Sequence, residues 1–203
     1  MKILIVAATG AELAPRLAAH GHDVDRLITG VGMVATAAHC AKALAGGTYG
    51  LALNFGVCGS FDPAFPPGRV VHVVADRIAE LGAEDGDALL TLKQLGLAGQ
   101  DEMINTEPPR NAALARVPAV KGITVNTVHG NAASIAAVRR RFDPQVESME
   151  GAAFMYACLI NGVPFAQVRA VSNAVEPRNK AAWKMAEAIA SLADAAREIL
   201  ERV

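Results

Sequence analysis

The 203-residue sequence has no surplus of charge of either sign, and cysteine is scarce. A net charge of -1 leaves no basic excess of the kind that nucleic-acid-binding proteins show. The cysteines, Cys40, Cys58 and Cys158, are far apart and odd in number, so they favour neither a disulfide framework nor a CxxC metal site. The simplest expectation is a reducing, cytoplasmic location.

Apolar runs long enough to cross a bilayer are also missing. The first run, Met1 to Ala8, is short and is followed by Thr9 and Gly10. It is better explained as a buried first strand than as a signal peptide. The later run from Gly151 to Ile160 is too short to span a membrane. The sequence therefore predicts a soluble protein.

Apolar residues are plentiful: they make up 52% of the chain, against 19% charged residues, which is enough for a large core. The length fits one α/β domain covering residues 1–203. Strands are expected at 3–8, 24–28, 51–55, 70–74, 120–125 and 165–171, and helices at 12–19, 33–44, 132–141, 150–160 and 181–202. Several strands are apolar on both faces, which predicts a three-layer α/β/α domain whose mixed, mostly parallel central sheet is flanked by helices.

Two further features concern packing rather than chemistry. The last expected helix carries an apolar stripe, formed by Met185, Ile189, Leu192, Ala196 and Ile199. We expect that stripe to pack onto the sheet. The segment 79–118 is richer in glycine, proline and charge, and predicts excursions off the sheet.

Two glycine-containing segments each follow an expected strand. Thr29 to Met33 opens a helix but lacks the third glycine of a dinucleotide fingerprint. Asn54 to Ser60 repeats the theme at the end of an apolar strand. Ligands of open α/β sheets bind at the carboxyl ends of strands. The two segments predict either one shared pocket or two independent turns, with equal weight.

A carboxylate at the start of a very apolar helix is more informative. Glu150 follows Ser148 and Met149 and precedes Gly151. It is either an acid of the first helical turn, favoured by the macrodipole, or a buried acceptor for two sugar hydroxyls. In the second interpretation Met149 provides an apolar wall.

The other polar candidates each have a structural explanation. Asn173, at the end of a buried strand, is suited to cap a turn, and Glu12 is spaced to pair with Arg16. His129 is expected on a loop surface, and the basic run 139–141 at a solvated helix end.

Taken in order, these segments resemble the nucleoside phosphorylase/nucleosidase family, above all its methylthioadenosine/S-adenosylhomocysteine nucleosidase branch. The resemblance runs from the first strand to the last helix, through residues 7–13, 30–32, 54–60, 148–150 and 169–173. It implies a nucleoside phosphorylase-like fold, a small-molecule nucleoside substrate, a homodimer or higher homo-oligomer, and neither a metal nor a cofactor.

One departure from that branch bears on the substrate, because Asn173 stands where the branch carries an aspartate. The segment from Ser172 to Asn179, with Trp183, is similar to the futalosine hydrolase subgroup of the family; so are residues 79–86 and 125–128. A carboxylate suits adenine, whose C6 amino group donates. Hypoxanthine presents a carbonyl oxygen there, and an amide both donates to O6 and accepts from protonated N7.

The resemblance also assigns roles to individual residues. Glu12 would be the general base that deprotonates the attacking water, at a transition state with oxocarbenium character. Glu150 would hold the ribose hydroxyls, while Asn173, positioned by Ser172, would stabilise the leaving hypoxanthine, whose N7 proton must come from solvent. The other expected substrate-binding residues are Met149 and Phe55 against sugar or base, Gly56, Ser148 and Val128, and Arg178 and Trp183 for the benzoate-bearing arm of futalosine.

Hydrolysis is favoured over phosphorolysis because the family's hexameric phosphorylases carry a phosphate-binding arginine where this chain has Asn54, and no other cation is evident. Two alternatives stay open. One is a nucleosidase acting on methylthioadenosine or S-adenosylhomocysteine, and the other is a non-catalytic nucleoside-binding protein with the same fold, which would need no general base.

Overall fold

The computed structural model describes residues 1–13, 21–86 and 88–203. Most of the expected helix at 12–19, from residue 14 on, and the partner Arg16 fall outside these described residues, whereas Glu12 and Leu13 lie in a turn and a bend. The strands are β1 Lys2–Ala7, β2 Asp23–Ile28, β3 Leu51–Ser60, β4 Val70–Ile78, β5 Gly82–Asp85, β6 Ala88–Thr91, β7 Glu102–Ile104, β8 Ala119–Thr124, β9 Val146–Ser148 and β10 Phe165–Ala174. The helices are α1 Met33–Gly46, α2 Ala132–Phe142, α3 Gly151–Asn161 and α4 Met185–Leu200, with short 3-10 turns η1 Leu114–Arg116 and η2 Lys180–Ala182.

The central sheet is mixed and closes on itself. Its strand order is β10-β4-β8-β9-β3-β1-β2, and β10 also pairs with β3, so the strands β3, β10, β4, β8 and β9 form a ring. β1 and β2 extend from the first half of β3, and β7 pairs with β4. The prediction of a mixed sheet with flanking helices is confirmed, but a plain three-layer stack is an incomplete description because part of the sheet is a closed barrel.

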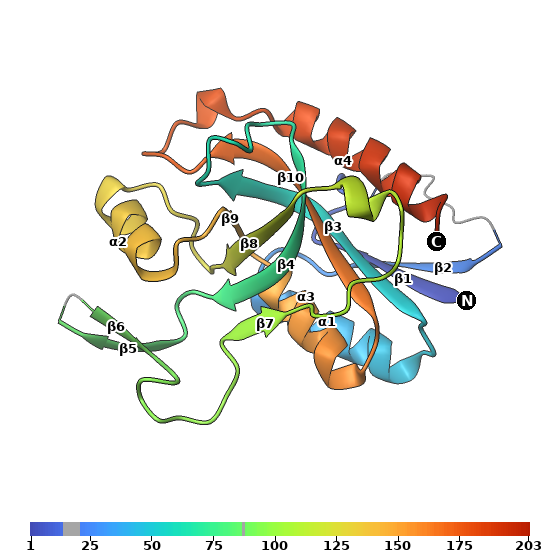
Figure 1. Cartoon of the computed structure of the whole chain (residues 1–203), viewed down its shortest axis with the longest axis horizontal. Coiled ribbons are helices and arrows are strands. Elements are labelled where there is room, and N and C mark those ends of the chain that lie inside the picture. Colours follow the sequence, from blue (N-terminus) through green and yellow to red (C-terminus); the bar gives the residue numbers. More distant parts are fainter. Residues whose placement is uncertain (14–20, 87) are drawn as a thin grey trace.

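Helices cover the sheet from two sides. α4 packs against β10, β3 and β4, while α1 packs on α3, which in turn contacts β8 and β4 (Figure 1). The hairpin β5–β6 forms its own two-stranded sheet and projects from the rest of the chain. Both ends of the chain lie on the side opposite that hairpin (Figure 1).

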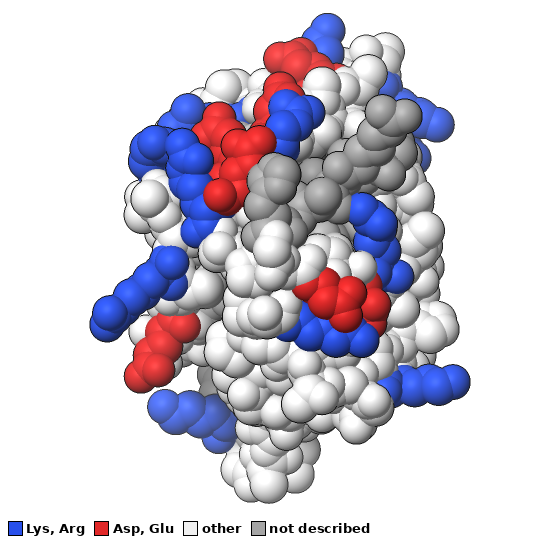
Figure 2. Space-filling model, turned by 90° about the vertical axis from the view of Figure 1, so that its right-hand side faces the viewer, with Lys and Arg blue, Asp and Glu red and all other residues white. Residues whose placement is uncertain are grey.

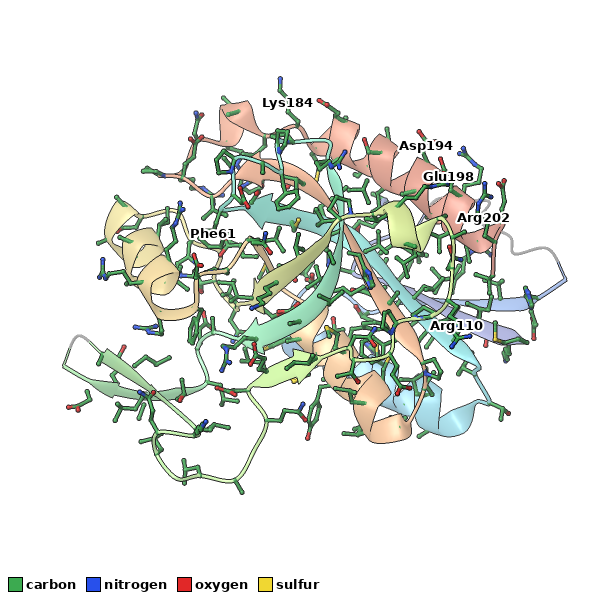
Figure 3. The ribbon with its side chains drawn as sticks, in the orientation of Figure 1. Phe61, Arg110, Lys184, Asp194, Glu198 and Arg202 are labelled. Atoms are coloured by element: carbon green, nitrogen blue, oxygen red, sulfur yellow. The ribbon has the colours of Figure 1, made fainter. Side chains whose placement is uncertain are left out.

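The core consists of the layers between the sheet and these helices. On the α4 side, buried strand residues such as Ile5 and Val168 meet Leu192 and Ile199 of the helix. The expected docking of α4 is therefore confirmed for Leu192, Ala196 and Ile199, whereas Met185 is 36% exposed. Figure 3 shows the polar side chains of Asp194 and Glu198 on the outer side of α4.

The strands that surround the site are longer than the apolar runs predicted. β3, β4 and β10 continue through polar and glycine residues because the barrel gives those residues ladder partners on both edges. The glycine segment Asn54 to Ser60, predicted to be a turn, is therefore strand. The short strands β5, β6, β7 and β9 were not predicted.

The surface carries charges of both signs. Figure 2 shows acidic and basic side chains interspersed on the face near the chain termini. No helix of the described residues is long and apolar enough to cross a membrane.

Candidate active site

A pocket of about 360 Å³ lies beside the second half of β3 and the end of β10. It gathers side chains from the segment after β1, the loop before α1, β3, β9, β10 and the start of α4. Most residues that the sequence singled out line it: Glu12, Val128, Ser148, Met149, Glu150, Ser172, Asn173 and Trp183. The two glycine-containing segments also meet here, through Val31 and Val57, so the prediction of one shared pocket is right although the second segment is not a turn.

Glu12 reaches the pocket from the segment that follows β1. One carboxylate oxygen, Oε2, accepts hydrogen bonds from the backbone N–H of Thr9 at 2.9 Å and from its hydroxyl at 2.8 Å. The other oxygen, Oε1, accepts from the backbone N–H of Val57 at 3.2 Å. These bonds fix a buried carboxylate at the pocket wall, where it is placed to accept a proton.

Glu150 lies at the N-terminal end of α3 and is also buried. Its Oε1 accepts from the backbone N–H of Gly32, whose φ of 100° is readily adopted only by glycine. Its Oε2 is 3.7 Å from Nη1 of Arg169. The loop before α1 and strand β10 therefore orient this acid from two sides.

Arg169 supplies the positive charge that makes this burial possible, and its role was not predicted. Its side chain is 1% exposed; Nη2 donates to Oδ1 of Asn54 at 2.6 Å and Nε donates to Oε1 of Gln167 at 3.0 Å. The statement that no cation is evident near the site is therefore wrong. The signal in the sequence was an arginine in the middle of an apolar strand, which is rarely buried without a carboxylate partner.

A second buried acid, Asp76, is linked to Arg169 through Gln167. Oδ2 of Asp76 accepts from Nε2 of Gln167 at 3.0 Å, and its Oδ1 accepts from the hydroxyl of Thr124 at 2.9 Å. The Thr124 hydroxyl in turn accepts from the backbone N–H of Ala152 in the first turn of α3. Burial raises the pKa of Asp76 to about 6, although these hydrogen bonds and Arg169 favour its charged form.

The end of β10 presents Asn173 to the pocket. The register with β3 shifts between Val171 and Asn173, a bulge that leaves Ser172 as the extra residue. The Ser172 hydroxyl donates to Oδ1 of Asn173 at 2.7 Å, and Nδ2 of Asn173 donates to the carbonyl of Ala174 at 2.9 Å. The amide keeps one N–H and one lone pair for a ligand.

A second unpredicted pair lies next to Asn173. Glu147 is 3% exposed, and its two oxygens accept from the backbone N–H of His129 at 3.0 Å and from Nδ1 of the same residue at 2.7 Å. His129 is thus not the loop-surface residue that the sequence indicated. With Arg178 and Trp183, whose guanidinium and ring are 5.7 Å apart, the pair lines a small pocket of about 40 Å³ that adjoins the main one.

Two expected contact residues, Phe55 and Gly56, do not line the pocket, and a third, Ser148, lines it while also binding the backbone of α3. The Phe55 ring is fully buried in the core under α4 rather than against a ligand, because its strand position faces the helix. Gly56 is required by packing, since a Cβ there would collide with the Arg169 guanidinium. The Ser148 hydroxyl accepts from the backbone N–H of Gly151, so it caps α3 while lining the pocket.

The remaining wall is apolar and uncharged. Cys58 lines the pocket, and burial raises the pKa of its thiol to about 12, so it stays protonated. Within the described residues, no group of three or more His, Cys, Asp or Glu side chains is arranged to hold a metal ion.

Known proteins match both this sequence and this fold. The model of the phosphorylase superfamily matches residues 14–203. Futalosine hydrolase of Streptomyces coelicolor is 39% identical over 179 residues, covering 84% of this chain and 76% of the relative. Futalosine hydrolase of Thermus thermophilus is 36% identical over 180 residues, covering 86% and 80%.

Two solved structures illustrate the likeness in fold. S-adenosylhomocysteine nucleosidase of Streptococcus pyogenes, in complex with 5-methylthiotubericidin, superposes with a TM-score of 0.80 at 20% identity over 99% of this chain and 96% of that one. Futalosine hydrolase of Helicobacter pylori superposes with a TM-score of 0.75 at 13% identity over 98% and 94%.

Proposed function

We infer the function from one premise: the chain belongs to the phosphorylase superfamily and, within it, to the futalosine hydrolases. It hydrolyses the N-glycosidic bond of futalosine and releases hypoxanthine and dehypoxanthine futalosine, a step of menaquinone biosynthesis. The observation that carries the chemistry is the meeting of Glu12, Glu150 and Asn173 in one pocket, although they are far apart in the sequence.

The two acids divide the work on the sugar. Glu150, held by Gly32 and Arg169, accepts hydrogen bonds from the ribose hydroxyls. Glu12, held by Thr9 and Val57, takes a proton from the water that attacks the anomeric carbon. As the bond to the base breaks, the sugar gains oxocarbenium character, which the nearby carboxylates stabilise electrostatically. Met149 and Val128 form apolar walls beside the sugar and base.

Asn173 recognises the base. Its free N–H donates to O6 of hypoxanthine, and its free lone pair accepts from N7–H of the departing base. The Ser172 hydroxyl favours this orientation, because its shorter contact, at 2.7 Å, is to Oδ1 of Asn173, while the carbonyl oxygen of Cys58 lies at 3.1 Å. Adenine would place an amino donor against the amide N–H, so the site favours a 6-oxopurine. Arg178 and Trp183 are candidates for the carboxylate and ring of the benzoate-bearing arm.

A homo-oligomer is part of the proposal. Apolar side chains remain exposed on neighbouring elements, namely Ile28 of β2, Val34 of α1 and Ile160 of α3, and Val34 is 79% exposed. Helix α1 packs on α3, so these elements offer an apolar surface for a second copy. Light scattering during size-exclusion chromatography measures the assembly directly, and a monomer at micromolar concentration would refute this part.

The direct test is incubation of the purified chain with futalosine in a buffer free of phosphate. We expect hypoxanthine to be released, as followed by liquid chromatography, at a rate unchanged by added phosphate. Methylthioadenosine and S-adenosylhomocysteine are the comparison substrates, and preferential release of adenine from them would reject the assignment. Binding of hypoxanthine without turnover of any of these nucleosides would indicate a non-catalytic nucleoside-binding protein.

A further inference from the structure

The His129–Glu147 pair takes no part in the chemistry described so far, yet it adjoins the base-recognising amide. Both oxygens of Glu147 accept hydrogen bonds from His129, one from the backbone N–H and one from Nδ1. Because Nδ1 donates to the carboxylate, Nε2 is the ring nitrogen left for another partner. No hydrogen bond to that Nε2 occurs among the described residues.

The pair and Asn173 face a common space. Glu147 and Asn173 line both the main pocket and the adjoining small pocket, and His129 lines the small one. Both side chains lie beside Gly59, where a Cβ would collide with Val175 and would be 3.3 Å from Nδ2 of Asn173 and 3.6 Å from Cγ of Glu147. The small pocket, at about 40 Å³, is large enough for a water molecule with polar partners.

The reaction needs a proton at this place. When the bond from the sugar to N9 breaks, its electron pair remains on the purine, and the neutral base forms only if a ring nitrogen gains a proton. The Asn173 amide is not an acid that can supply one. Glu12 accepts a proton from water on the sugar side and does not replace a donor on the base side.

We propose that His129, held in orientation by Glu147, donates the proton that the leaving purine takes up at N7, through one water molecule in the small pocket. The proposal rests on the proposed hydrolysis of futalosine. The attacking water forms a bond from its oxygen to the anomeric carbon and gives a proton to Glu12. The Nε2 proton of His129 passes to the relay water, which protonates N7. Neutral imidazole and protonated Glu12 remain, and solvent exchange restores both.

The form of His129 that donates is the imidazolium, with a proton on each ring nitrogen. Glu147 contacts the ring from β9 and Glu176 lines the same small pocket, so two carboxylates favour this charge against the guanidinium of Arg178, which also lines that pocket. The edge of the ring meets Phe61 at a centroid distance of 6.3 Å. A carboxylate against Nδ1 fixes the tautomer and stabilises positive charge on the ring, as the acid does in other histidine–carboxylate pairs.

A substrate whose leaving base needs no proton distinguishes a proton donor at His129 from a residue that only supports the structure. We compare His129→Gln with wild type on futalosine and on futalosine methylated at N7, whose base departs as a neutral molecule. With futalosine, kcat should fall by about 10² to 10⁴, the usual contribution of a general acid, whereas with the methylated substrate it should change by less than about threefold. Equal losses on both substrates, or an unchanged kcat on futalosine, would overturn the proposal.

The control variant is His22→Gln. Among the described residues, the hydrogen bonds of His22 are to the N-terminal amine and to the carbonyl of Val203, away from the pocket, so this variant should retain wild-type kcat on both substrates. The wild-type enzyme provides a test that does not depend on folding of a variant. Its kcat on futalosine should fall at alkaline pH, and its kcat on the methylated substrate, whose leaving base needs no proton, should not. If kcat falls at alkaline pH on both substrates, the assignment of His129 is overturned but the hydrolase is not. If the wild-type enzyme releases no hypoxanthine, both the proposed hydrolase and this step are rejected.

Discussion

Replacement of Asn173 by aspartate tests how the site selects its base. In the structure the amide oxygen accepts from Ser172 and the amide nitrogen donates to the carbonyl of Ala174. In Asn173→Asp the Ser172 hydroxyl still donates, but the second carboxylate oxygen faces the Ala174 carbonyl and, in the complex, O6 of hypoxanthine. The variant therefore loses two donated hydrogen bonds and gains two contacts between lone pairs.

The expected magnitude follows from the position of the side chain. Sites built on such hydrogen bonds reject a mismatched analogue by roughly 10⁴-fold, about 5 kcal/mol, when the groups are fully buried. Asn173 is only half-buried, so water partly replaces the lost partners. We expect kcat/KM for futalosine to fall by about 10² and kcat/KM for its 6-amino analogue to rise relative to it. The unfavourable contact with Ala174 should lower the free energy of unfolding by about 1 kcal/mol.

The assay is the ratio of kcat/KM for futalosine to that for the 6-amino analogue, with each base quantified by chromatography. Asn179→Asp is the matched control, because it adds the same charge at the rim of the small pocket without touching the base-recognising amide. The control should leave the ratio unchanged. If Asn173→Asp also leaves the ratio within about threefold of wild type, the amide does not read O6 and the reasoning is wrong.

The remaining predictions concern the acids and the buried charges. Glu12→Gln should lower kcat by about 10² or more while hypoxanthine binding, measured by calorimetry, stays the same; equal losses of both would make Glu12 structural. Arg169→Met should lower the free energy of unfolding in urea by about 3 to 5 kcal/mol, because it strands the Glu150 carboxylate; a loss below about 1 kcal/mol would contradict that pairing. Burial raises the pKa of Asp76 from 3.8 to about 6, so its contribution to stability falls by about 3 kcal/mol as pH rises through that range. Burial lowers the pKa of His72 from 6.5 to about 4, so its contribution rises by a similar amount of about 3 kcal/mol over the same range. In wild type the two contributions largely cancel. Between pH 4 and 6.5, the free energy of unfolding in urea should rise with pH more steeply than in wild type for Asp76→Asn, and should fall relative to wild type for His72→Gln. Curves parallel to that of wild type would refute both assignments.

The pattern of apolar residues along the sequence was sufficient to predict much of the fold, but not the closure of the sheet into a barrel. Apolar runs located the beginnings of β3, β4 and β10, because those residues face the packed helices. The second halves carry residues such as Ser60 and Asp76, whose strand conformation depends on neighbours across the barrel. The ring itself arises from the pairing of β10 with β3, a contact between distant segments that no periodicity encodes.

The site divides in the same way. Glu150 was singled out because a carboxylate is costly to bury at the start of a very apolar helix, whereas the role expected of Asn173 came from the resemblance to the family. Arg169 and Glu147 were missed as participants because their importance lies in their partners, and the partners are assigned by the fold. Phe55 was misplaced because the two faces of a doubly buried strand look alike in sequence.

The pairing of β3 with β10 bears on how the molecule is made. Ala52 aligns with Phe165, so this ladder cannot form until a ribosome has released most of the chain. Closing so long a loop between parallel strands is slow, which places the assembly of Arg169 and Asn173 late in folding. Hypoxanthine binding during refolding would then report completion of the last ladder, and a chain truncated before β10 would have no site at all.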